Sequence, residues 1–175
     1  MIPRRVVWTC LLAITLVLAA CYPDLDWREV TSASGGYAVL MPAKPEHLQR
    51  EVAVGGILLT MSMDSVQKEG IAFGAAYADI PAQYSRYQAL LDAARDALLR
   101  NIDGRITSER EVVVDGAAGH EFYAEGTMGK KQMRLAARVL IAGHRFYQVV
   151  CVGQSERLAT ADVALFLNSF RLLTK

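Results

Sequence analysis

The stretch QMRLAARVLIAGHRFYQVVCV, residues Gln132–Val152, carries the pattern that decides the fold. In its first half, one face would hold Met133, Leu135, Ala137, Val139 and Ile141, and these alternate with Gln132, Arg134, Ala136, Arg138 and Leu140. A period of two is typical of a half-buried β-strand. Gly143 and His144 then predict a turn into a second apolar strand over residues 145–152. The stretch therefore predicts two antiparallel strands joined by a tight turn.

Similar signals extend to both sides of this stretch. The pairs Gly55-Gly56 and Asp115-Gly116 stand between apolar runs and predict two more hairpins. Residues 71–77 form another strand, in which heavier residues alternate with small ones. Shorter strands are expected near residues 27–30 and 37–41.

Two segments have helical periodicity instead. Between Tyr84 and Asn101 the apolar positions are Tyr87, Leu91, Ala94 and Leu98. Ser85 can cap this helix, and Thr160 can cap a second, shorter helix that ends at Asn168. The sequence therefore predicts an α+β fold, with a central antiparallel sheet covered by helices.

The N-terminal segment has the features of a bacterial export signal. Arg4 and Arg5 precede an uncharged apolar run over residues 6–18. A helix that spans a bilayer needs about 20 such residues, so this run is short for a span. The ending Leu18-Ala-Ala-Cys21 resembles the lipobox of bacterial lipoproteins. That resemblance implies cleavage before Cys21 and a lipid on its sulfur; the alternative is an uncleaved anchor with an ordinary Cys21.

This interpretation gives three segments: a lipoprotein signal peptide over residues 1–20, a lipidated Cys21 with a tether to residue 34, and a domain over residues 35–175. The lipid would hold the chain on the periplasmic side of a bacterial membrane without crossing it. Tyr22 in place of an aspartate favours the outer membrane over the inner one, by analogy with enteric lipoproteins. The 18 acidic residues nearly balance the basic ones, which argues against a nucleic-acid partner.

Several stretches of this domain resemble the PsbP-like superfamily, including its DcrB-type lipoproteins. They are the segments at residues 36–45, 112–122, 145–148 and 166–171, together with the strand that holds Arg138. The resemblance implies an α/β/α sandwich, in which helices lie on both sides of a central antiparallel sheet. Members of this superfamily mostly act as binding or assembly modules. The resemblance therefore implies an accessory or binding role beside a membrane-associated complex, with a protein partner in the envelope.

Sequence motifs of common enzymes and metal sites are missing. The chain has no HExxH, CxxC or GxSxG pattern and no phosphate-binding glycine loop. We therefore expect no enzymatic activity, no cofactor and no dedicated metal site. Glu121 and Glu125 would share one strand face and could hold a hard cation if loops contributed, but a solvated face is the simpler interpretation.

Arg134 and Arg138 would also share one face of their strand. They are the candidate partner-binding residues, because a cationic stripe can bind lipid headgroups or carboxylates. The alternative is that Glu121 and Glu125 on the neighbouring strand pair with them.

Cys151 would be the remaining free thiol of the mature chain, and its apolar strand predicts a buried core residue. An alternative function for the whole chain is a small-molecule or metal carrier with a pocket between sheet and helix. An envelope hydrolase with an unrecognised site is the third hypothesis.

Overall fold

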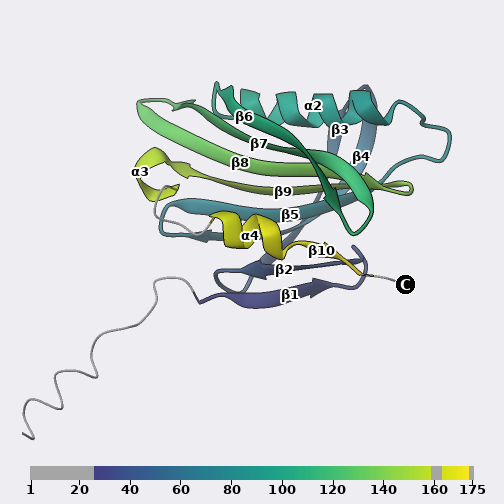
Figure 1. The fold of residues 1–175 in the computed structure, drawn as a ribbon, viewed down its shortest axis with the longest axis horizontal. Coiled ribbons are helices and arrows are strands. Elements are labelled where there is room, and N and C mark those ends of the chain that lie inside the picture. Colours follow the sequence, from purple (N-terminus) through teal and green to yellow (C-terminus); the bar gives the residue numbers. More distant parts are fainter. Residues whose placement is uncertain (1–25, 159–162, 174–175) are drawn as a thin grey trace, which may run out of the picture.

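The computed structural model describes residues 26–158 and 163–173. Within them the chain forms a large and a small antiparallel sheet (Figure 1). The large sheet has the order β3-β4-β5-β9-β8-β7-β6. Its strands are β3 (Glu46–Val54), β4 (Ile57–Lys68), β5 (Ile71–Asp79), β6 (Arg105–Val114), β7 (Ala117–Met128), β8 (Lys131–Ala142) and β9 (Arg145–Gln154). The small sheet has the order β1-β2-β10, with β1 (Arg28–Ser32), β2 (Tyr37–Met41) and β10 (Arg171–Leu172).

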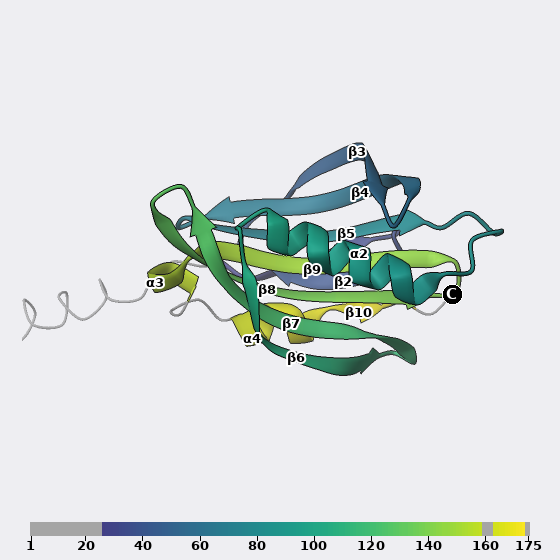
Figure 2. The same cartoon turned by 90° about the horizontal axis from the view of Figure 1, so that it is seen from above.

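The two faces of the large sheet have different covers. Helix α2 (Tyr87–Arg100) lies on one face. The small sheet and the short helices α3 (Ser155–Leu158) and α4 (Val163–Ser169) lie on the other (Figures 1 and 2). Among the described residues, no helix combines the length and the apolar character that a membrane crossing requires.

The predicted hairpins are confirmed. Gly55 and Gly56 have φ of 60° and 80°, and Asp115 and Gly116 have φ of 48° and 84°. Positive φ at both central residues is the geometry whose twist matches that of the flanking strands. The helix α2 then carries the chain from β5 across the sheet to β6, at the far edge. This crossover lets β9 return to pair with β5 and unite the two halves of the sheet.

Three sequence-based expectations need correction. The N-terminal strands β1 and β2 leave the main sheet and form the small one, so one cover is part sheet rather than helices alone. Strand β8 is buried on both faces instead of one, because α2 covers one face and α3 and α4 contact the other. The residue before α2 is Arg86, and no side chain caps the helix, so Ser85 is not its cap. The predicted cap at Thr160 and the predicted lipid site at Cys21 lie outside the described residues.

Each face of the large sheet has its own hydrophobic core. Tyr37, Phe73 and Phe166 belong to the core beside the small sheet. Leu90 and Phe122 belong to the core under α2. The first core also contains a buried hydrogen bond, which the Tyr37 hydroxyl donates to Asp64 Oδ2 at 2.6 Å.

Cys151 lies in the core beside the small sheet and is 0% exposed, as its sequence context predicts. Burial raises the pKa of its thiol to about 12. Because the thiolate is the reactive form, we expect iodoacetamide at pH 8 to leave Cys151 unmodified in the folded protein and to alkylate it in denaturant. Peptide mass spectrometry measures both states. Rapid alkylation of the folded chain would contradict the burial.

Candidate ligand groove

Strand β5 runs beneath a recess on the α2 side of the large sheet, and its neighbours β4 and β9 supply the side chains that line the recess. Its large residues, Ile71 and Phe73, point into the core beside the small sheet. The other face of β5 carries small residues, and a side chain on Gly74 would contact Met63 and Val150. The side chains on this face of β5 therefore extend less far from the sheet than those of the neighbouring strands β4 and β9. This geometry follows from the alternation of heavy and small residues at 71–77.

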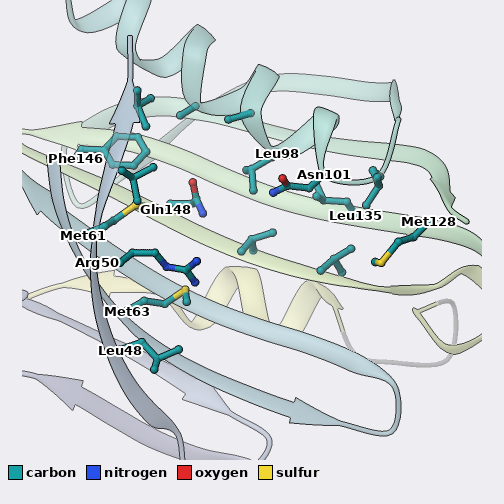
Figure 3. A pocket seen from close by; sticks show the side chains of 17 residues that line it. Leu48, Arg50, Met61, Met63, Leu98, Asn101, Met128, Leu135, Phe146 and Gln148 are labelled. Atoms are coloured by element: carbon teal, nitrogen blue, oxygen red, sulfur yellow. The ribbon is translucent and has the colours of Figure 1, made fainter. Parts of the chain in front are cut away.

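The recess widens into a groove of about 400 Å³ between the sheet and the C-terminal half of α2 (Figure 3). Strands β3, β4, β8 and β9 supply one side, and Ala94, Ala97 and Leu98 supply the helix side. The two alanines leave room that larger residues would fill. Its lining is mostly apolar and includes three methionines, Met61, Met63 and Met128.

The polar side chains of this lining are Arg50, Asn101 and Gln148. Figure 3 shows Arg50 reaching from β3 into the space in which the Gln148 carboxamide also lies. Register places Met61 directly opposite Arg50, between Leu59 and Met63 on β4. The same-face neighbours of Arg50 on this strand pair are therefore apolar. Within residues 26–158 and 163–173, no carboxylate pairs with its guanidinium.

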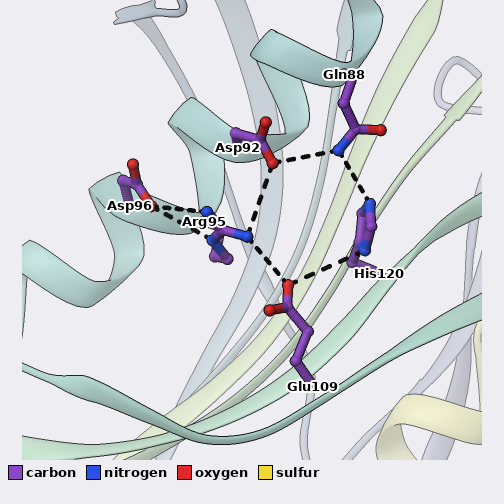
Figure 4. Close-up of polar contacts among 6 residues, drawn as sticks. All are labelled: Gln88, Asp92, Arg95, Asp96, Glu109 and His120. Carbon is purple, nitrogen blue, oxygen red and sulfur yellow. Dashed lines mark hydrogen bonds and ion pairs between the residues drawn. The ribbon is translucent and has the colours of Figure 1, made fainter.

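A polar cluster joins the outer side of α2 to β6 and β7 (Figure 4). Arg95 pairs with Glu109 at 3.2 Å and also contacts Asp92 and Asp96. Nε2 of His120 lies 3.2 Å from the Gln88 amide nitrogen, and Nδ1 lies 4.0 Å from Glu109. These contacts tie the helix to the edge of the sheet.

Arg138, one of the two candidate partner-binding residues, is buried. It donates hydrogen bonds to Glu121, to the Leu167 carbonyl oxygen at 2.8 Å and to Asn168 Oδ1 at 3.1 Å. Its side chain is 7% exposed, and that of Glu121 is 2% exposed. The geometry matches the ion-pairing alternative: Arg138 holds α4 against β8.

The environment of Glu121 sets the charge of this buried pair. Burial alone would raise the pKa of Glu121. Hydrogen bonds from Arg138 and Arg110 outweigh that effect and keep its pKa below the usual range. The carboxylate therefore stays ionised at neutral pH, between the two guanidinium groups.

Arg134, the other candidate, is half-exposed and pairs with Glu125 at 3.0 Å. It can still reach solvent, so a partner contact there stays a prediction. Arg145 lies near the opposite end of the sheet, where it pairs with Asp79.

The histidines and acidic residues do not assemble into a metal centre within the part of the chain that the structure describes. His120 and Glu121 point to opposite faces of β7, as strand alternation predicts. His47 contacts Asp64, and His144 contacts the Tyr87 hydroxyl, at separate places.

Comparison with known proteins supports the fold. No protein-family model matches the chain, and no curated protein matches its sequence. Among solved structures, the cyanobacterial PsbP (CyanoP) of Synechocystis sp. PCC 6803 is similar, with a TM-score of 0.57 at 12% identity. The match covers 89% of this chain and 99% of that one. PA94 of Pseudomonas aeruginosa, a protein of unknown function and putative regulator, matches over 79% of this chain and 90% of that one, at 6% identity and a TM-score of 0.44. The chain thus has a PsbP-like fold, as its sequence motifs predict.

Proposed function

We propose that this chain is a non-enzymatic binding protein of the bacterial cell envelope, anchored through a lipid on Cys21, that holds an apolar ligand in the groove beneath α2. The observation that carries the proposal is the open, methionine-lined groove. The sequence pattern at Leu18–Cys21 supports the anchor.

The composition of the groove favours a binding role. Exposed apolar surface costs roughly 25 cal/mol per Å² relative to burial, and large apolar patches on monomeric proteins usually mark binding sites. Methionine side chains are unbranched and polarisable, so they adapt to ligands of different shapes. A volume of about 400 Å³ lies within the range of small-ligand sites.

The same lining gives little support for catalysis. Its one charged side chain is the guanidinium of Arg50. Such a group can hold an anion, but it does not exchange protons with a substrate as a general acid or base does. A holding function fits these residues better than a hydrolytic one.

The position of β1 is compatible with a membrane tether. This first strand is on the side of the large sheet opposite α2 (Figure 1). The groove beneath α2 and this first strand therefore lie on opposite sides of the sheet. The outer membrane is again favoured by Tyr22.

Photo-crosslinking in native cells tests the proposal. A diazirine amino acid of methionine-like size replaces Met61 inside the groove, in the full chain. The matched control carries it at Thr60, the adjacent β4 residue, which is exposed on the opposite face of the sheet. We expect adducts at position 61 whose mass is that of a small apolar molecule.

The identity of the adduct decides between the functions. A protein adduct at position 61 would replace the carrier function with the accessory role beside a membrane-associated complex, the groove then receiving an apolar segment of that partner. Equal and low yields at positions 61 and 60 would overturn the proposal.

A further inference from the structure

We infer that the ligand of the groove is a fatty acid, with its carboxylate on Arg50 and its acyl chain along the methionine-lined floor. This inference rests on the proposed function and names the chemical class of its ligand. It follows from the charge, surroundings and hydrogen-bonding capacity of the lining.

Arg50 is exposed on the edge strand β3, at the rim of the groove, and its charge has no carboxylate partner among the described residues. Arg134, Arg138 and Arg145, on β8 and β9 of the same sheet, each pair with a carboxylate. Arg50 has no such partner among the described residues, and apolar side chains flank it on its own face. A guanidinium at the edge of an apolar groove presents two parallel N–H donors, which match the two oxygens of a carboxylate.

The rest of the lining indicates the chemistry of the rest of the ligand. Beyond Arg50, the lining offers the carboxamides of Gln148 and Asn101 and otherwise apolar side chains. Figure 3 shows Met128 on the far side of the groove from Arg50, with Leu98, Asn101 and Leu135 between them. A molecule with one anionic end and a long apolar body is complementary to this arrangement.

The backbone pairing beneath the groove disfavours a peptide. Strands β4, β8 and β9 are each hydrogen-bonded to a strand on both sides, so the floor that they form offers no free backbone donors or acceptors; the unpaired backbone edge is that of β3, at the rim of the groove. A peptide lying on this floor would bury amide groups without partners, at a cost of roughly 1–3 kcal/mol each. An acyl chain has no such groups. The single positive charge of Arg50 also matches a singly charged carboxylate better than it matches a doubly charged phosphate.

Photolabelling with head-group variants tests the inference. The full chain is reconstituted in nanodiscs of zwitterionic lipid and irradiated with a dodecyl chain that carries a terminal diazirine. The head group is a carboxylate, a hydroxyl or a trimethylammonium. Mass spectrometry then compares labelling of the groove peptides with labelling of the rest of the chain, which corrects for partitioning into lipid.

We expect the carboxylate probe to label the groove peptides about tenfold more than the trimethylammonium probe, as the loss of a charged hydrogen-bond pair predicts. Arg50→Glu should remove this preference, whereas Arg50→Lys should retain most of it. Arg105→Glu makes the same charge change on β6, at a residue that is exposed and outside the groove lining, and should leave the preference unchanged.

The outcomes separate this inference from the proposed function. Equal groove labelling by all three head groups would overturn the fatty-acid assignment and leave the apolar binding function standing. No groove labelling by any probe would also overturn the assignment, and the Met61 crosslinks in cells would then decide the function. An unchanged preference in Arg50→Glu would refute the role of Arg50.

Discussion

Replacing Arg138 by alanine is expected to lower the free energy of unfolding by about 3–5 kcal/mol, because it leaves a buried carboxylate without its main partner. Glu121 is 2% exposed and would keep the contact with Arg110. That second arginine is largely exposed, so it compensates poorly for a buried pair. The Leu167 carbonyl and the Asn168 side chain would also lose their donor.

Denaturant unfolding followed by circular dichroism measures this effect. Arg134→Ala is the matched control, because Arg134 lies on the same strand and face but forms a half-exposed pair with Glu125. An exposed pair contributes about 0–1 kcal/mol, so the control should unfold nearly as the wild type does. Equal losses in the two variants would show that the Arg138 pair does not hold α4 as described.

Replacing Met61 by tryptophan is expected to reduce ligand capture in the groove about tenfold, since it places a larger side chain in the space that a ligand would occupy. Met61 is half-buried. It lies beside Arg50, across the groove from the α2 residues of the lining. The measurement is the yield of small-molecule adduct from a diazirine amino acid at Met63, in cells.

Thr60→Trp controls for the size of the new side chain. Thr60 neighbours Met61 on β4, but its side chain is exposed on the other face. Adduct yield should therefore stay at the wild-type level in this variant. Undiminished yield in a folded Met61→Trp protein would place the captured molecule outside the groove.

The sequence predicts the local structure well, for physical reasons. The glycine turns at 55–56 and 115–116 and the alternation over 133–141 are short-range signals, and the structure has a strand or turn at each. The burial of Arg138 is a long-range effect. It depends on α4, a segment about 30 residues later in the chain, which covers the outward face of β8. The sequence pattern of β8 itself does not predict that contact.

The small sheet and the groove lining also depend on contacts between residues that are far apart in the sequence. Pairing of β2 with β10 joins the two ends of the chain, which no local pattern could reveal. The groove, however, has a visible signal in the sequence. Small residues alternate with Ile71 and Phe73 along β5, and a strand that carries only small side chains on one face leaves a recess beneath a covering helix. Its lining could not be predicted, because it combines residues from six elements.

Methionine methyl NMR of the full chain in nanodiscs tests the central claim, fatty-acid binding in the groove, most directly. Met61, Met63 and Met128 line the groove, whereas Met41 and Met133 are buried outside its lining. On addition of dodecanoate, the account predicts saturable shifts of the three groove methyl signals and constant positions for the other two. Unchanged groove signals, or equal shifts of all five, would contradict it.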